Sequence, residues 1–220
     1  NQIIIESLRL TLTTSIISLF ITLLLGTPLA FLLSSSKNKF LKSLTSLIQF
    51  PIFIPPTVAG ISLILFFNNS NFISDFFVTI GINIPFSVFA VIIAQVFVSS
   101  PFYIRTLQVG IANFQQSYTE SALMLGASSF KNVVFVLIPN LRNSIIVGAL
   151  LSWSRSVGEL GATLIFAGNI IGVTQTMPLE ILSSFEDANG FNIAVTIALI
   201  SILISGIIVV CISYINETLS

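Results

Sequence analysis

The sequence predicts an all-α, polytopic membrane protein: a bundle of about five transmembrane helices in one domain over residues 1–220. Hydrophobic residues make up 55% of the chain and charged residues only 7%, whereas about a quarter of the residues of an average soluble protein are charged. The mean hydropathy is +1.05. The apolar residues also gather in stretches of about 20, the length that an α-helix needs to cross a bilayer.

Five stretches reach this length, at residues 10–33, 44–67, 85–104, 143–167 and 193–215. The second contains Pro51, Pro55 and Pro56, followed by Gly60, so we expect it to be kinked or locally unwound. Membranes tolerate the freed carbonyl groups only where protein or a cavity satisfies them. This helix is therefore expected in the interior of the bundle, where an ordinary structural kink is the simplest interpretation of its prolines.

The charged residues of the loops predict the orientation, because lysine and arginine are enriched on the cytoplasmic side. One set of loops is cationic, with Lys37, Lys39, Lys42, Arg105, Lys131 and Arg142. The alternate loops contain no lysine or arginine and carry Asp75, Glu180, Glu186 and Asp187. We predict a multi-pass protein of the cell membrane with its N-terminus outside, its C-terminus in the cytoplasm, and a long cytoplasmic segment between Arg105 and Arg142. Arg9, at the outer end of the first stretch, is the exception and is expected to snorkel to the interface.

Several function classes are disfavoured by composition. The net charge is zero, which gives no electrostatic basis for binding nucleic acid. The chain has no histidine and one cysteine, Cys211, so we expect no His/Cys metal site, no Cys-His nucleophile, no disulfide within the chain and no cofactor. Cys211 lies in an apolar stretch and is expected to be a small core residue. No basic region precedes the first stretch, so no signal peptide is expected.

Two opposite charges, Arg155 and Glu159, lie in the fourth apolar stretch. Residues four positions apart share a helix face, so the side chains are expected to interact. Intramembrane charges are costly unless they are paired or face a polar cavity. One interpretation is a static salt bridge, and the other is a lining or gating element of a transport pathway.

The cytoplasmic segment has signals for two short helices. Ser117 and Glu120 form an S-x-x-E capping box that predicts a helix start. Gly126 is suited to ending that helix, and a second helix is predicted from Ser128 or Ser129 to Pro139. A small amphipathic helix-turn-helix is suited to the groove of another protein, or to the lipid headgroup region.

This segment resembles the E-A-A-x3-G-x9-I-x-L-P signature of permease subunits from binding-protein-dependent ABC importers. Glu120, Ala122, Gly126 and Pro139 match this signature, whereas Ser121, Val136 and Ile138 replace its first alanine, its isoleucine and its leucine with small or apolar residues. The resemblance implies that residues 112–139, which we call the coupling segment, bind a cytoplasmic ATPase. The chain has no G-x4-G-K-[ST] loop, which agrees with ATP hydrolysis on a partner chain and with a subunit that is not itself an enzyme.

Further motifs extend the resemblance from about Glu6 to Val209. Residues 153–162 read W-x-R-x2-G-E-x-G-A, and they are followed by A-G-N at 167–169 and T-Q-T-x-P-L at 174–179. These motifs resemble those of molybdate or tungstate permeases, which are related to sulfate permeases. The resemblance implies a type I importer fold and assigns Arg155, Gly158, Glu159 and Gly161 to the intramembrane pathway.

The resemblance also implies partners. Five spans are too few to enclose a pathway with two gates, so we expect a homodimer in the lipid bilayer, with two cytoplasmic ABC ATPase subunits and one extracytoplasmic oxyanion-binding protein. A path for a dianion needs mainly neutral donors, because strong cationic sites would trap the ion. The polar candidates are Thr57, Ser62, Gln95, Ser99, Ser100 and Thr163. The alternatives are a sulfate or thiosulfate permease and, less well supported, a channel or secondary transporter subunit or an intramembrane enzyme.

Overall fold

The computed structural model describes residues 2–35, 39–68, 83–114 and 116–219, with the isolated positions 75, 77, 79 and 81. Within these residues every regular element is a helix, and the all-α fold class is confirmed. Three helices of this part of the chain are long and apolar enough to cross a membrane alone. Up to five crossings result if each of two strongly bent helix pairs counts as one span.

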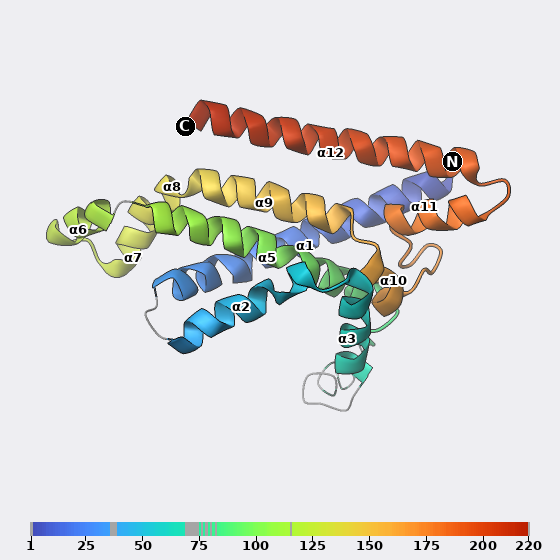
Figure 1. The fold of residues 1–220 in the computed structure, drawn as a ribbon, viewed down its shortest axis with the longest axis horizontal. Helices are drawn as coiled ribbons and strands as arrows, with labels where there is room; N and C mark the ends of the chain where they lie inside the picture. The colour runs from blue at the N-terminus through green and yellow to red at the C-terminus, as the bar shows by residue number, and fades with distance from the viewer. Residues whose placement is uncertain are drawn as a thin grey trace.

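The longest helices are α1 (Gln2–Ser35), α5 (Val88–Asn113) and α12 (Phe191–Leu219), and they run along the long axis of the molecule (Figure 1). α1 and α12 contain the first and fifth predicted spans, and α5 contains the third from residue 88 onward. However, α5 continues past Ile104, so Arg105 lies within a helix and not in a loop as predicted, while its predicted cytoplasmic side stays a prediction. One arginine does not end a helix here, because its side chain is exposed while Ile104 and Leu107 on the other face are buried.

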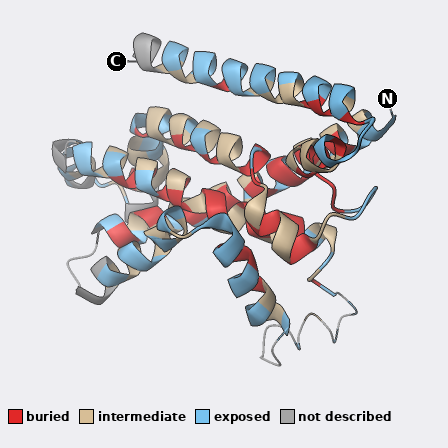
Figure 2. Cartoon of the chain, turned by 45° about the vertical axis from the view of Figure 1, so that its right-hand side comes forward, coloured by how far each residue is buried: buried red, intermediate tan, exposed pale blue. Residues whose placement is uncertain are grey.

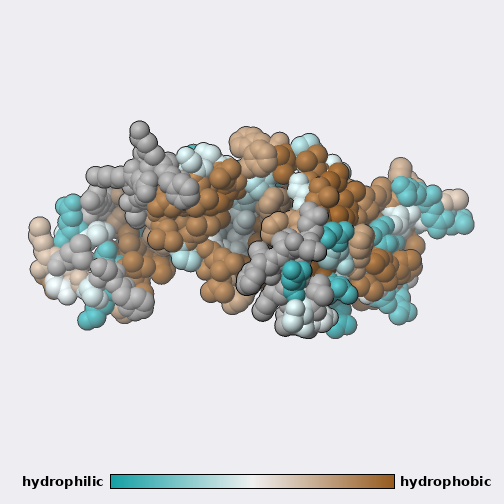
Figure 3. Space-filling view, turned by 90° about the horizontal axis from the view of Figure 1, so that it is seen from below, coloured by the Kyte–Doolittle hydropathy of each residue, from teal (hydrophilic) through white to brown (hydrophobic). Residues whose placement is uncertain are grey.

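The two ends of the chain lie at opposite ends of this long axis (Figure 1). α12 is the most exposed of the long helices, whereas α1 and α5 are buried along one face (Figure 2). Cys211 is exposed on α12, so its predicted place in the core is wrong for the single chain. Hydrophobic residues cover much of the face shown in Figure 3, and hydrophilic residues lie at its two ends and in a further group near its middle. This distribution fits a chain surrounded by lipid or by other membrane subunits.

The second predicted span is divided into α2 (Lys39–Phe53) and α3 (Pro56–Asn68). The axes of the two helices differ by 117°, and Ile54 and Pro55 lie between them outside any helix. The predicted interruption at the prolines is therefore confirmed. The predicted interior location is wrong for the single chain, because α3 buries only Ala59, Gly60 and Leu63 among its described residues.

The fourth predicted span is also interrupted, and its prediction as one continuous helix over 143–167 is wrong. α9 (Arg142–Val157) ends before Gly158, and α10 (Gly161–Ala167) begins three residues later. Glycine lowers helix stability, and two of the four residues Gly158–Gly161 are glycine. Glu159 then provides a carboxylate for the amide end of α10, as described below.

One helix was missed by the sequence analysis. α11 (Met177–Glu186) occupies part of the predicted acidic outer loop. Glu180 is not a loop residue but is buried in α11, where its Oε1 accepts a hydrogen bond of 2.6 Å from the Ser184 hydroxyl. Pro178 in the first turn after Thr176 was the available signal, since proline favours the first turn of a helix.

The buried face of α1 is polar and built of small residues. Its buried hydroxyl side chains are those of Ser7, Thr11, Thr14, Ser15, Ser18 and Thr22. Ser18 Oγ donates to Gln95 Oε1 of α5 at 2.9 Å, and Trp153 Nε1 of α9 donates to Ser15 Oγ at 3.0 Å. Small residues let membrane helices approach closely, and interhelical hydrogen bonds then hold them together. These contacts fix α5 and α9 against α1.

Candidate functional site

The two helix interruptions meet in space. We call them the paired breaks: residues 54–55 between α2 and α3, and residues 158–160 between α9 and α10. A Cβ added to Gly161 would lie 2.8 Å from Pro56 Cβ, and one added to Gly60 would lie 2.8 Å from the Ala162 carbonyl oxygen. Glycine is therefore required on both sides of the contact between α3 and α10.

The predicted ion pair lies at the second of these breaks. Arg155 Nη2 is 2.7 Å from Glu159 Oε2, and the side chain of Glu159 is fully buried while that of Arg155 is 28% exposed. The other oxygen, Glu159 Oε1, accepts a hydrogen bond of 2.8 Å from the Ala162 amide. Glu159 thus bridges the last turn of α9 and the first turn of α10.

This arrangement has a clear electrostatic basis. A carboxylate is favoured near the amide end of a helix, where the first N–H groups have no intrahelical partner. The guanidinium neutralises the remaining charge of a group that would be very costly to bury alone. The pair therefore stabilises an interrupted helix, while the partial exposure of Arg155 leaves it accessible to a polar neighbour.

The two glycines assigned to the pathway differ. Gly161 packs against Pro56, as described above. Gly158 is exposed, with φ of −87°, and an added Cβ would meet only the Ser154 carbonyl oxygen at an ordinary 3.7 Å. The local backbone of this chain therefore requires glycine at 161 and not at 158.

The polar pathway candidates are divided by the structure into two groups. Gln95, Ser99 and Thr163 are buried inside the single chain, and Gln95 is bonded to Ser18. Thr57 and Ser62 are exposed on α3, and Ser100 is half-buried. Of these six residues, the ones on α3 are the better placed to face a path outside the single chain.

The motif residues that follow α10 form a hydrogen-bonded loop. Thr174 Oγ1 donates to the Gly168 carbonyl at 3.1 Å and accepts from the Ile170 amide at 3.0 Å. Asn169 Nδ2 donates to Ser183 Oγ of α11 at 2.6 Å. These residues have a structural role that the motif alone did not reveal.

The coupling segment contains the predicted helix-turn-helix. α6 (Gln116–Met124) is followed by a turn in which Gly126 has φ of +86°, and the Ala127 amide donates to the Ala122 carbonyl at 3.0 Å. This is the hydrogen bond of a Schellman cap with glycine in the left-handed conformation. α6 begins one residue before Ser117, which lies in its first turn rather than before it. The side chain of Ser117 is outside the described residues, and Glu120 is exposed.

The second half of the segment is helical to its end. α7 (Ser129–Asn132) begins where predicted, and a π-helical turn (Val133–Leu137) leads into α8 (Ile138–Asn140). Ile138 and Pro139 are exposed, and the axis bends by 62° before α9. α6 and α7 lie together at the end of the molecule where the C-terminus is found (Figure 1).

The turn between the two halves presents apolar side chains. Met124 is 87% exposed and Leu125 is 89% exposed. Exposed apolar groups of this kind mark contacts with a partner or a membrane. α9 connects the coupling segment to the paired breaks, because it begins after α8 and carries Arg155 in its last turn. At 1.5 Å per residue it is about 24 Å long.

Fold and site together define a class: a helical membrane subunit with interrupted spans, an intramembrane ion pair and an exposed helical docking element. The family described as "Binding-protein-dependent transport system inner membrane component" matches residues 22–217. The chain belongs to this family.

Named relatives agree with this assignment. A Clostridium pasteurianum protein described as "Probable transport system permease protein NifC" is 42% identical over 184 residues, which cover 83% of this chain and 64% of the relative. The molybdenum transport system permease protein ModB of Mycobacterium tuberculosis is 36% identical over 92% of this chain and 76% of its own length. The sulfate transport system permease protein CysW of Synechocystis is 29% identical over 90% and 73%.

A solved structure shows the same fold. The chain is similar to a chain of the MetNI methionine ABC transporter in its inward-facing form, with a TM-score of 0.71 and 16% sequence identity. The similarity covers 97% of this chain and 96% of that one. The predicted type I importer fold is confirmed, and a similarity at this identity says nothing of the substrate.

Proposed function

We propose that the chain is the permease subunit of an ABC importer that moves molybdate or tungstate across the cell membrane. The observation that carries the proposal is the relatedness to permeases named for molybdenum transport, at 36% identity over 92% of the chain, against 29% for the sulfate permease CysW. Transport would proceed by alternating access, driven by ATP hydrolysis on a separate subunit.

The proposed partners follow from the exposed surfaces. Met124 and Leu125 would insert into a cleft of a cytoplasmic ATPase, and the exposed faces of α2 and α3 would be covered by a second copy of the chain. The assembly would be a homodimer with two ATPase subunits and one extracytoplasmic oxyanion-binding protein. The paired breaks, with Arg155 and Glu159, would lie beside the pathway between the two copies.

The test is ATP hydrolysis by the reconstituted complex with its own binding protein. We expect stimulation by nanomolar to micromolar molybdate or tungstate and little effect of sulfate at much higher concentration. Selectivity would reside chiefly in the binding protein, whose fixed donors reject an ion that leaves buried groups unpaired. Stimulation by sulfate alone would identify a sulfate permease, the second candidate, and stimulation by no oxyanion would refute the substrate class.

The orientation is tested separately. We propose an external N-terminus and a cytoplasmic C-terminus. Two observations support this orientation: the lysine and arginine residues outside the apolar stretches fall in alternate connecting segments, and the two termini lie at opposite ends of the molecule. After Cys211→Ala, single cysteines at exposed Tyr118 and Asn189 are treated with an impermeant thiol reagent in intact cells. Only Asn189→Cys should react, and reaction of Tyr118→Cys would reverse the orientation.

A further inference from the structure

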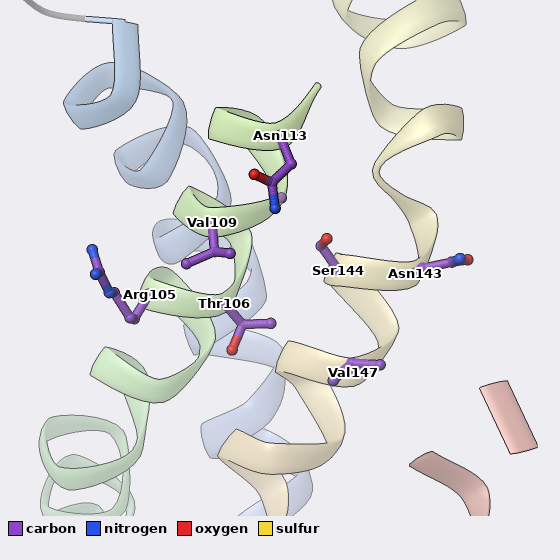
Figure 4. A pocket seen from close by; sticks show the side chains of 8 residues that line it. Arg105, Thr106, Val109, Asn113, Asn143, Ser144 and Val147 are labelled. Carbon is purple, nitrogen blue, oxygen red and sulfur yellow. The ribbon is translucent and has the colours of Figure 1, made fainter. Parts of the chain in front are cut away.

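An open cavity of about 330 Å³ lies between α5 and α9, in the half of the molecule next to the coupling segment (Figure 4). Its polar side chains are those of Arg105, Thr106 and Asn113 from α5, and of Asn143 and Ser144 from α9. A water occupies about 30 Å³ in the liquid, so the cavity has room for a small polyatomic ion that keeps some of its hydration.

The electrostatic character of this cavity is set by one cation. Arg105 has no hydrogen bond or ion pair with any residue that the structure describes, where the only salt bridge joins Arg155 and Glu159. No carboxylate is among the described residues that line the cavity. Arginine remains protonated in proteins and presents a planar fork of donors that matches a carboxylate or a tetrahedral oxyanion. The cavity therefore favours an anion.

Neutral donors lie on the same surface. The Ser144 hydroxyl and the Asn113 amide have no hydrogen-bond partner among the described residues. The Thr106 hydroxyl donates to the Phe102 carbonyl at 2.8 Å and keeps lone pairs, and such a hydroxyl rotates to suit a new partner. Figure 4 shows Thr106, Asn113 and Ser144 beside the space between α5 and α9, with Arg105 at its outer edge pointing away from α9, so that its long side chain must turn to reach an ion held there.

The floor of the cavity is a close contact between the two helices. A Cβ added to Gly110 would clash with the side chain of Ser144, so glycine lets α9 approach α5 at this point. Ser144 of α9 is therefore held directly against α5 at Gly110. Because α9 also carries Arg155 at its other end, a shift of α9 against α5 would change this cavity and the paired breaks together.

We propose that this cavity is an inner oxyanion site, in which Arg105 binds a tetrahedral oxyanion and Ser144 and Asn113 donate hydrogen bonds to it. The inference rests on the proposed function, since it places a low-affinity stop for the transported ion near the cytoplasmic end of the path. A single cation with neutral donors holds an ion without trapping it. A phosphate of a lipid headgroup has the same chemistry and is the other possible source of the oxyanion.

The test uses the full complex of permease and ATPase subunits in nanodiscs, without nucleotide or binding protein. Equilibrium binding of radioactive molybdate is measured for the unmodified complex and for Arg105→Gln, Arg105→Lys and Ser144→Ala. Charged hydrogen bonds are the strong ones, so Arg105→Gln should weaken binding by roughly tenfold or more, Ser144→Ala by a few-fold, and Arg105→Lys by less than Arg105→Gln. Arg9→Gln, which removes an exposed arginine of α1, is the matched control and should bind like the unmodified complex.

Native mass spectrometry of the same samples distinguishes the two sources. Retention of an anionic lipid that depends on Arg105, without molybdate binding, would assign the site to lipid phosphate. Equal molybdate binding by the unmodified complex and Arg105→Gln, or no oxyanion that depends on Arg105, would overturn the inference. Molybdate-stimulated hydrolysis with the binding protein, measured in parallel, confirms an intact complex. If it persists while the binding result is negative, only the inner site fails and the proposed function stands.

Discussion

The coupling segment and the paired breaks are both interruptions of helical structure, yet they are stabilised in opposite ways. At the paired breaks the carboxylate of Glu159 is fully buried and both of its oxygens have partners within the chain. In the coupling segment the apolar side chains of Met124 and Leu125 are almost fully exposed. The first region is complete in a single chain, whereas the second needs another protein or a membrane. Substitutions at the breaks should therefore reduce stability, and those in the coupling segment should reduce assembly.

The largest effect on stability is expected from breaking the ion pair. Arg155→Leu leaves a buried carboxylate without its counter-charge, which costs about 3–5 kcal/mol. The double variant Arg155→Leu/Glu159→Leu leaves no uncompensated charge and should be less destabilised than Arg155→Leu, although it loses the bond to the Ala162 amide. Denaturation midpoints in detergent measure both.

Transport by the double variant then separates the two interpretations of the pair. A stable double variant without transport would support a role in gating. Normal transport would leave only the structural role. A double variant that is less stable than both single variants would contradict the pairing as described.

The second effect is expected where the breaks touch. Gly161→Val forces a branched side chain against Pro56, and overpacking of this kind costs about 1–3 kcal/mol. Gly158→Ala is the matched control, since its Cβ would lie at an ordinary distance from any neighbour. The same denaturation assay should show a loss for Gly161→Val alone. Equal losses for the two variants would mean that α10 does not pack against α3 as described.

The third effect lies in the turn of the coupling segment. Gly126 has φ of +86°, a conformation that costs a non-glycine L-residue about 1–2 kcal/mol. Gly126→Val should therefore disturb the turn and weaken ATPase association, whereas Gly126→Asn should largely restore it, because asparagine tolerates this conformation. Co-purification of the ATPase subunit with the membrane-inserted permease measures association. Full association of Gly126→Val would exclude this turn as the docking element.

The sequence predicted those features that depend on local chemistry. The prolines of the second stretch specify the break at Pro55, and Gly126 specifies the turn after α6. The spacing of Arg155 and Glu159 predicted that their side chains would interact, although Glu159 proved to lie beyond the end of α9. The interruption at residues 158–160 was missed because apolar residues continue on both sides of it. The carboxylate that stabilises the restart of the helix had been interpreted only as half of an ion pair.

Burial was harder to predict, because it depends on tertiary contacts. Cys211 and most of α3 are apolar but exposed in the single chain, whereas Glu180 is acidic but buried in α11. Hydropathy identifies segments that are apolar enough for the membrane. It does not distinguish side chains that face lipid from side chains that pack against protein. The inner cavity was missed for a related reason: Arg105 was interpreted as a loop cation.

The smallest effect on stability, and the sharpest test of the contrast, is expected at the exposed tip of the coupling segment. Met124→Ser and Leu125→Ser remove side chains that contact little of the chain. The free energy of unfolding should therefore change by less than about 0.5 kcal/mol. If a cleft of the ATPase buries these two side chains, each substitution should weaken the free energy of association with the ATPase by about 1.5–3 kcal/mol. ATPase co-purification and binding-protein-stimulated hydrolysis should then fall strongly while the permease itself stays folded.

Ile202→Ser, which changes an equally apolar, exposed residue on α12, controls for a general loss of hydrophobic surface. Unchanged ATPase association in the Met124→Ser/Leu125→Ser double variant would mean that the exposed tip rests on lipid, as the alternative interpretation of this helix-turn-helix holds.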